Sequence, residues 1–416
     1  MAFLRDNLVK KNEPLFLIAK VRVSVPISSQ NSQNEKSEFD YLVSKGTQIQ
    51  IGNIVKVSFR NRTIWGVVYS LEYETKIKHS KLKQILSISG LSPIKLCNLK
   101  FLEKVSEWTM APFGQVLRAL LSAPNAYKDE TPIFYYSLSS AAQFEMEKLS
   151  KARKKVINWC MQKPPVSINT LCKEIGVSRN TINLMFQEGQ LERVQNSLKP
   201  KEDTQTILKR LKTAIGAASK LNLSTEQQQA ADQIIVHENK FNIVLLDGVT
   251  GSGKTEVYFE LVKRQILSGN QCLILLPEIA LTAGWGWGRV LIKRFGVFSI
   301  FWHSGITASK KKIIWRDINE GYPGVVVGAR SALFLPFSSL SVIVVDEEHD
   351  VGYKQEEQVI YNARDMAILG LNLNATLFLQ AQPLLRKLDK HVIWALSAHN
   401  AYKQIWSRYY ARHSND

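Results

Sequence analysis

The most constraining feature of this chain is a glycine-rich loop at residues 248–255, which reads Gly-Val-Thr-Gly-Ser-Gly-Lys-Thr. This run fits the phosphate-binding loop of nucleotide hydrolases. The apolar run at 241–246 predicts a buried parallel strand before the loop, and the apolar spacing at 256–267 predicts a helix after it. A strand, a glycine loop and a helix place several backbone N–H groups around one phosphate. The sequence therefore predicts an α/β nucleotide-binding lobe.

The side chains of the loop predict its ligands. We expect Lys254 to reach the β- and γ-phosphates of ATP and Thr255 to bind Mg²⁺. The other expected ATP contacts in the loop are Gly248, Gly251, Ser252 and Gly253. Earlier in the chain, a helix start at 223–230 offers Gln227 as the candidate that reads the adenine edge, as a glutamine does in many helicases. An ordinary solvated helix start is the alternative.

An acidic cluster that directly follows an apolar run at 342–345 is the second signal. Sheets of α/β proteins bind ligands at the carboxyl ends of their strands, which predicts that this cluster lies beside the phosphate loop. Asp346 is the candidate for holding Mg²⁺ through water, and Glu347 for orienting and polarising the attacking water. His349 is the candidate for coupling the nucleotide state to DNA contact. The alternatives are carboxylates that cap a neighbouring helix and a histidine in a surface loop.

Further motifs follow in a fixed order along the chain. They are Gly-Lys-Thr-Glu-Val-Tyr at the loop, Leu-Pro-Glu-Ile-Ala-Leu-Thr at 276–282, Trp-His-Ser-Gly at 302–305, Gly-Ala-Arg-Ser-Ala-Leu-Phe at 328–334, Asp-Glu-Glu-His-Asp at 346–350, Tyr-Lys-Gln-Glu-Glu at 353–357 and Tyr-Asn-Ala-Arg-Asp at 361–365. Together they resemble the PriA family of bacterial primosomal helicases over roughly residues 14–379. The resemblance implies a superfamily 2 DNA helicase that uses ATP and Mg²⁺, moves 3′ to 5′, binds branched DNA and restarts stalled replication forks. It also implies other primosome proteins as partners and a DNA contact at Arg330.

Residues 1–94 are predicted to form a β-rich domain that contains a hairpin with a basic turn. In the PriA family this domain binds a DNA 3′ end. The resemblance places Asp40 and Tyr41 in that pocket, with Asp40 accepting a hydrogen bond from the terminal 3′-hydroxyl. Lys83 is expected near the DNA backbone, and Arg60, where the family usually has glycine, is expected to contact phosphate. The alternative for Asp40 and Tyr41 is a simple strand start.

Residues 95–195 are predicted to be mostly helical. Within them, residues 167–182 resemble a helix-turn-helix, since Gly176 permits the turn and Ser178 can cap the second helix. One interpretation turns Arg179 toward DNA, and the alternative is a winged-helix domain that serves as a spacer or protein contact. The remaining predicted segments are a linker at 196–222, a RecA-like helicase lobe at 223–379 and an atypical tail at 380–416.

The charge balance favours a polyanionic partner. Lys and Arg number 54 against 36 Asp and Glu, for a net charge of +18, which suggests nucleic acid; a generally solvated basic surface is the alternative.

No apolar run is long enough to span a membrane, and residues 1–14 lack the apolar segment of a secretory signal. The four cysteines form no C-x-x-C pair, so we expect no zinc site and a reduced, cytoplasmic protein.

Members of the PriA family continue with a Ser-Ala-Thr-Pro motif, a second RecA-like lobe with an arginine finger and a zinc module, which we do not recognise in these 416 residues. We therefore expect a truncated chain that binds ATP with little turnover, because an arginine finger contributes ~10³–10⁵ in rate in related hydrolases. A shifted reading frame near residue 379 permits Ser-Ser-Ala-Thr-Pro-Ser, so the tail is hypothesised to be out of frame; a divergent helical tail is the alternative. Two functions stay open: a helicase that is active once a missing half is supplied, and a non-catalytic binder of branched DNA from a decaying or split gene.

Overall fold

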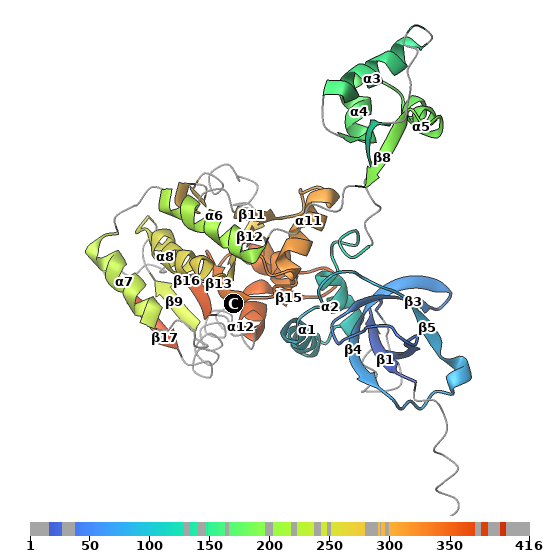
Figure 1. Cartoon of the computed structure of the whole chain (residues 1–416). Coiled ribbons are helices and arrows are strands. Elements are labelled where there is room, and N and C mark those ends of the chain that lie inside the picture. Colours follow the sequence, from blue (N-terminus) through green and yellow to red (C-terminus); the bar gives the residue numbers. More distant parts are fainter. Residues whose placement is uncertain are drawn as a thin grey trace, which may run out of the picture. The chain divides into compact units, whose positions relative to one another are not determined.

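The computed structural model of the chain forms two compact units, residues 1–128 together with 204–416, and residues 129–203 (Figure 1). The structure describes residues 16–26, 38–128, 134–139, 147, 149–162, 166–195, 203–217, 223–236, 243–247, 251–278, 290–291, 293–295, 299–370, 376–381 and 392–396. Within these ranges no helix combines the length and the apolar character needed to cross a lipid bilayer.

The larger unit begins with a closed β-barrel. Its strands, in spatial order, are β1 (Ile18–Val23), β2 (Glu38–Leu42), β5 (Lys83–Ile88), β3 (Ile54–Phe59) and β4 (Arg62–Glu72), with the short helix η1 (His79–Lys81) before β5. Side chains alternate between the two faces: Val55 and Val57 are fully buried, whereas Lys56 between them is exposed. The barrel confirms the expected β-rich N-terminal domain.

A tight turn joins β3 to β4. Phe59 pairs with Arg62, which leaves a two-residue loop of Arg60 and Asn61. Both loop residues have positive φ, 43° and 60°, as a type I′ turn requires. The predicted hairpin is therefore confirmed, and Arg60 occupies a left-handed conformation that explains why a glycine suits this position.

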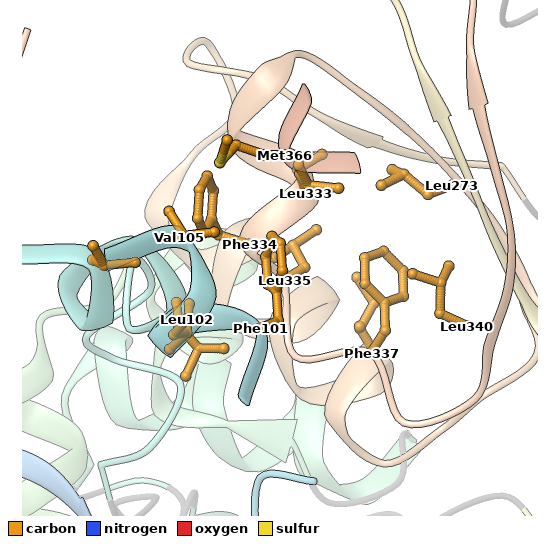
Figure 2. Packing of buried hydrophobic residues seen from close by; sticks show 14 of the residues in the cluster. Phe101, Leu102, Val105, Leu273, Leu333, Phe334, Leu335, Phe337, Leu340 and Met366 are labelled. Carbon is orange, nitrogen blue, oxygen red and sulfur yellow. The ribbon is translucent and has the colours of Figure 1, made fainter. Parts of the chain in front are cut away.

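Two helices follow the barrel, α1 (Leu96–Thr109) and α2 (Phe113–Leu120). We expected residues 95–195 to form one helical domain, but the structure places α1 and α2 in the larger unit. Figure 2 shows the reason: Phe101 and Val105 of α1 pack among side chains of the later lobe, including Phe334. The ring centroids of Phe101 and Phe334 are 5.7 Å apart.

Polar contacts reinforce this packing at buried positions. The Asn98 amide donates to the carbonyl of Phe337 at 2.9 Å, and the indole N–H of Trp315 donates to the carbonyl of Leu120 at 2.8 Å. Each satisfies a buried side-chain donor with a backbone acceptor from a distant part of the chain. The barrel, its two helices and the lobe therefore share one core.

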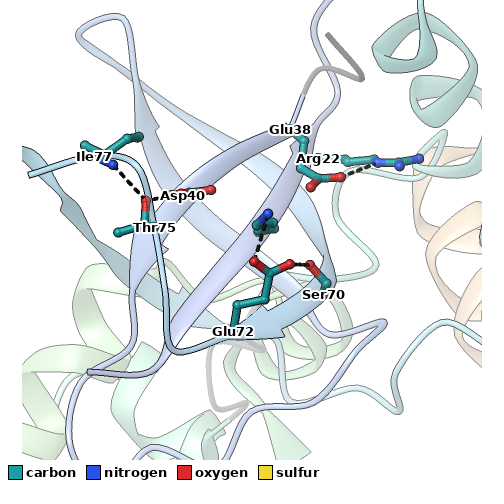
Figure 3. Close-up of polar contacts among 8 residues, drawn as sticks. Arg22, Glu38, Asp40, Ser70, Glu72, Thr75 and Ile77 are labelled. Atoms are coloured by element: carbon teal, nitrogen blue, oxygen red, sulfur yellow. Dashed lines mark hydrogen bonds and ion pairs between the residues drawn. The ribbon is translucent and has the colours of Figure 1, made fainter. Parts of the chain in front are cut away.

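Arg22 of β1 ties the barrel to α1. Its side chain is only 2% exposed and pairs with Glu38 at 3.2 Å and with Glu103 at 2.9 Å (Figure 3 shows the Glu38 pair). The guanidinium also lies 3.3 Å from the ring centroid of Tyr69 and 4.5 Å from that of Phe113. Two carboxylates and two rings thus compensate the charge that folding removes from water.

The lobe is built on a seven-stranded sheet in the order β11-β12-β10-β13-β16-β9-β17. The strands are β9 (Ile243–Asp247), β10 (Gln271–Leu275), β11 (Ser299–Trp302), β12 (Gly324–Gly328), β13 (Leu340–Val345), β16 (Thr376–Ala381) and β17 (Val392–Leu396). All the neighbouring pairs are parallel except β17 on β9. The helices of the lobe are α6 (Thr204–Ala217), α7 (Thr225–Val236), α8 (Lys254–Leu267), α11 (Ala308–Asn319) and α12 (Ala363–Leu369), with the short segments η3 (Arg330–Phe334), η4 (Val351–Tyr353), β14 (Lys354–Gln355) and β15 (Tyr361–Asn362).

Both faces of this sheet are buried. Along β13, Val342 and Val344 belong to the core formed with α6, α7 and α8, whereas Ile343 and Val345 belong to the core on the opposite face. That second core contains residues of α11, α12, α1 and α2. Burial on both faces explains the continuous apolar runs that predicted parallel strands, and the RecA-like α/β lobe is confirmed.

The segments on either side of the predicted lobe contribute to it. Residues 204–217, expected within a linker, form α6, whose Leu211 and Ile215 are buried against α8. Residues 380–381, expected in the tail, extend β16, and residues 392–396 add β17 as an antiparallel edge strand. The other tail residues lie outside the described ranges, and the out-of-frame hypothesis stays a prediction.

The smaller unit has a winged-helix architecture. Its helices are α3 (Lys151–Gln162), α4 (Ile168–Ile175) and α5 (Arg179–Gln187), and its sheet has the order β7 (Val166–Ser167), β6 (Phe134–Leu138), β8 (Leu191–Gln195). Gly176 makes the turn with φ at 70°, and the Ser178 hydroxyl accepts from the backbone N–H of Thr181 at 3.3 Å. Leu171 and Ile182 are fully buried. The predicted helix-turn-helix is confirmed.

The Arg22 cluster yields a stability prediction. Replacing Arg22 with Ala leaves a cavity and removes the cation that pairs with Glu38 and Glu103, so we expect the free energy of unfolding to fall by roughly 2 to 4 kcal/mol. Lys20→Ala is the matched control, because Lys20 pairs with Glu72 at the surface at 2.9 Å, and its loss should cost roughly 1 kcal/mol or less. Urea unfolding of the two variants measures both values. Equal losses would contradict the role given to Arg22.

Candidate functional site

The phosphate loop runs into the N-terminus of α8. Gly251 and Gly253 have φ values of 82° and 80°, and Gly253 is the N-cap residue of the helix. These values belong to the left-handed region, which glycine adopts without strain. Lys254 is buried at the first position of α8. The loop therefore ends on a helix N-terminus, as anion binding requires. Gly248 lies outside the described residues.

Gln227 is held by both ends of its amide. Its Oε1 accepts from the backbone N–H of Ser224 at 3.0 Å, and the Ser224 hydroxyl accepts from the backbone N–H of Gln227 at 3.2 Å. This reciprocal pair is a capping box at the start of α7. The Nε2 of Gln227 donates to the carbonyl of Ser252 at 3.0 Å. The structure thus shows Gln227 supporting the phosphate loop, and adenine recognition stays a prediction.

Asp346 follows β13 directly and is 4% exposed. Its Oδ2 accepts from the hydroxyl of Tyr258 at 3.3 Å. Burial, followed by the neighbouring charge of Glu347, raises the pKa of Asp346 to about 6, and the positive charge of Lys254 works in the opposite direction. The loop and the acidic strand end therefore meet, as the sequence predicted.

Two buried oxygens at this site lack a hydrogen-bond partner among the described residues: Ser252 Oγ and Asp346 Oδ1. Buried polar atoms in proteins are rarely unpaired, so these two indicate where a ligand contributes the missing partners. A hydroxyl beside the phosphate loop and a carboxylate oxygen beside a buried lysine suit a phosphate and a hydrated Mg²⁺. The residues present fit a magnesium nucleotide.

Glu347 and His349 lie side by side in the turn after Asp346. Their Oε2 and Nε2 atoms are 3.4 Å apart. Glu347 has a positive φ of 51°, a conformation that is uncommon outside glycine and that often marks functional sites. The structure thus brings together the candidate for water orientation and the candidate for coupling; their roles remain predictions.

Three groups around this turn were not singled out from the sequence. Tyr258 binds Asp346, as described, and the Tyr353 hydroxyl donates to the carbonyls of Asp346 and Leu275. Arg364 pairs with Glu348 at 2.9 Å. All three lie in the motifs quoted for the family resemblance, which was the available signal, but only the fold shows which atoms they contact.

Arg330 has a defined structural contact. Its Nη1 donates to the carbonyls of Gly352 and Lys354 at 2.9 and 2.8 Å. The side chain therefore holds the segment that follows the acidic turn, and its predicted DNA contact is untested.

The barrel places the proposed 3′-end residues on and beside β2. The Thr75 hydroxyl donates to Asp40 Oδ2 and accepts from the backbone N–H of Ile77 at 3.1 Å (Figure 3). Tyr41 faces the barrel core, where its hydroxyl donates to the carbonyl of Ser58 at 3.0 Å. Asp40 is therefore the better placed of the two for a ligand, and Tyr41 has a structural role in the barrel.

The remaining DNA candidates are exposed. Lys83 lies in β5 opposite Tyr41 in the strand register, and Arg60 is at the tip of the β3–β4 hairpin. Arg179 opens α5 in the smaller unit. Exposure permits contact with phosphate but does not establish it, so all three remain predictions.

Comparisons with known proteins match the barrel region and the lobe to two protein families. Residues 21–122 match the PriA 3′ DNA-binding domain model, and residues 224–385 match the DEAD/DEAH box helicase model. The replication restart protein PriA of Rickettsia prowazekii (strain Madrid E) is 32% identical over 338 residues, covering 79% of this chain and 38% of that protein. Its counterpart from Chlamydia pneumoniae is 31% identical over 401 residues, covering 91% of this chain and 51% of that protein. The chain thus spans about half the length of these relatives or less.

A solved structure, RecG bound to a three-way DNA junction, is also similar, at 20% identity and a TM-score of 0.31 over 42% of this chain and 23% of that chain. The parallel sheet, the phosphate loop and the acidic strand end, together with the helicase match, define the class as superfamily 2 helicases, whose cofactors are ATP and Mg²⁺. With a PriA 3′ DNA-binding domain ahead of the helicase lobe, the chain belongs to the PriA-like proteins. The domain match also indicates DNA as the partner class.

Asp346 yields a prediction about stability and pH. Its folded pKa of about 6 lies above the ordinary value of 3.8, so the carboxylate destabilises the fold above pH 6, and stability recovers as the pH falls toward 4. We expect Asp346→Asn to raise the free energy of unfolding at pH 7 by roughly 1 to 3 kcal/mol and to abolish the gain in nucleotide affinity from Mg²⁺.

Urea unfolding at pH 7 and pH 5 measures the first effect, and binding of a fluorescent ATP analogue with Mg²⁺ or EDTA measures the second. Asp232→Asn, at an exposed position of α7, is the control and should change neither. A less stable Asp346→Asn variant at pH 7 would contradict the assigned cost of burial.

Proposed function

We propose that this chain binds ATP with Mg²⁺ and branched DNA with a 3′ end, as part of a 3′–5′ helicase of replication restart. One observation carries the proposal: the barrel that matches a 3′ DNA-binding domain and the lobe that matches a helicase share a single core. A DNA end and a nucleotide are then held by one folded unit. A cytoplasmic location and contacts with other primosome proteins belong to the same proposal.

The nucleotide part of the proposal assigns one task to each side chain. Lys254 contacts the β- and γ-phosphates, the Thr255 hydroxyl and Asp346 hold the metal, and Glu347 orients the attacking water. Bound Mg²⁺ supplies neutralisation of phosphate charge. The backbone N–H groups at the start of α8 stabilise the same charge without reorganisation, because the loop has already placed them.

The DNA part of the proposal centres on Asp40. Thr75 occupies Oδ2, which fixes the carboxylate and leaves Oδ1 to accept from a terminal 3′-hydroxyl. Lys83 and Arg60 contribute positive charge for the phosphate backbone. A carboxylate recognises a hydroxyl end and repels a phosphorylated one, so the chemistry itself provides selectivity for an extendable DNA end.

The second candidate function is a binder of branched DNA without catalysis. It is favoured by the single seven-stranded sheet that supplies the described nucleotide-site residues, since superfamily 2 motors enclose ATP between two lobes. The two candidates agree in binding branched DNA and differ in ATP binding and turnover.

An ATPase assay on the 416-residue chain separates them. We expect micromolar ATP binding by these 416 residues in the presence of Mg²⁺, little turnover with forked DNA, and faster turnover when a second RecA-like lobe from a PriA relative is added, because an arginine from a second lobe stabilises the transition-state charge in related hydrolases. Robust turnover by the chain alone would contradict the need for a second lobe. Binding of forked DNA with no ATP binding would favour the non-catalytic candidate.

Recognition of the 3′ end is tested by changing both partners. We expect Asp40→Ala to weaken binding to a fork with a 3′-hydroxyl by roughly tenfold, the effect of one lost hydrogen bond to a charged group, and to leave binding to a 3′-phosphate fork unchanged or tighter. Fluorescence anisotropy at fixed salt measures both. Glu74→Ala is the matched control, since it removes the same charge from an exposed site on the barrel. An Asp40→Ala variant that keeps its preference for the hydroxyl end would refute the assignment.

A further inference from the structure

Tyr258 is a buried phenol in the middle of the nucleotide site. It is 1% exposed, and its hydroxyl donates to Asp346 Oδ2 at 3.3 Å. The same phenol is hydrogen-bonded to the side chain of Thr255, which lies one helical turn earlier on α8. One hydroxyl therefore joins the two side chains that the proposed function assigns to Mg²⁺.

The direction of these hydrogen bonds follows from the donors available. The Tyr258 proton goes to the Asp346 carboxylate, so the phenol oxygen can only accept from the Thr255 hydroxyl. A threonine hydroxyl that donates to the phenol keeps its own lone pairs free to accept or to bind a cation. At the other end, Asp346 Oδ2 is occupied, while Oδ1 is buried with no partner among the described residues.

We propose that Tyr258 is a positioning residue for the magnesium nucleotide: it orients the lone pairs of Thr255 and the free oxygen of Asp346 before the ligand arrives. The inference rests on the proposed function, in which this loop binds ATP with Mg²⁺. Tyr258 acts through these two side chains and contacts neither phosphate nor metal. Its removal should therefore weaken the part of nucleotide binding that depends on Mg²⁺ and spare the rest.

The test compares the affinity for a fluorescent ATP analogue in Mg²⁺ and in EDTA. We expect the wild-type chain to bind more tightly in Mg²⁺, and Tyr258→Phe to lose roughly tenfold in Mg²⁺ with less than about twofold change in EDTA. Tyr127→Phe is the matched control, because it removes a buried phenol hydroxyl that donates to the Leu121 carbonyl at 3.2 Å, away from the loop. It should change neither affinity.

The comparison between Mg²⁺ and EDTA separates positioning from a general loss of packing. A loss of packing would weaken binding by the same factor in Mg²⁺ and in EDTA, whereas a loss of positioning weakens it in Mg²⁺ alone. Equal losses in the two conditions would overturn the inference, and so would a Tyr258→Phe variant that keeps the full Mg²⁺ effect. A wild-type chain that binds the analogue equally well in Mg²⁺ and EDTA would instead overturn the proposed function, and the inference with it.

A second measurement keeps the native hydroxyl and is used if Tyr258→Phe does not fold. The chain is labelled with 3-fluorotyrosine at position 258 or, as the control, at position 127. We expect the ¹⁹F resonance of the label at 258 to shift when Mg²⁺ is added to the nucleotide-bound chain, and the label at 127 to stay unchanged. An unchanged resonance at 258 would overturn the inference.

Discussion

The need to cover both faces of the parallel sheet governs the rest of this structure. Val342 and Val344 of β13 require the helices α6 to α8 on one side, and Ile343 and Val345 require a second layer on the other. Part of that second layer is α1 and α2, which come from the N-terminal segment of the chain. A sheet that is buried on both faces along β13 thus recruits the helices that follow the barrel, and the barrel becomes part of the same unit as the lobe.

This arrangement gives the proposed function a physical basis. A 3′-end pocket on a freely jointed domain would not sense the nucleotide, whereas a pocket whose domain shares a core with the lobe moves with it. Buried hydrogen bonds from Asn98 and Trp315 hold the two in one geometry. The winged helix forms its own unit with its own core.

Several features of the proposed nucleotide site lower the stability of the unbound chain. Asp346 is buried with a raised pKa, one of its oxygens is unpaired among the described residues, and Glu347 adopts a positive φ. Each feature is unfavourable in the unbound chain and becomes useful once a charged ligand supplies partners. The hydrogen bonds from Tyr258 and Tyr353 hold the acidic turn in place despite these costs.

The sequence by itself determined the phosphate loop, the strand before Asp346, the β3–β4 hairpin and the helix-turn-helix, because each depends on local spacing, glycine positions and short apolar runs. Tertiary structure alone decided that α1 and α2 join the larger unit, that Gln227 supports the loop, that Tyr41 faces the barrel core, and that Tyr258 links Thr255 to Asp346. These outcomes depend on which buried surfaces and polar atoms meet across long stretches of chain. Local patterns carry no information about those partners, since packing and hydrogen-bond satisfaction are settled only when the whole core assembles.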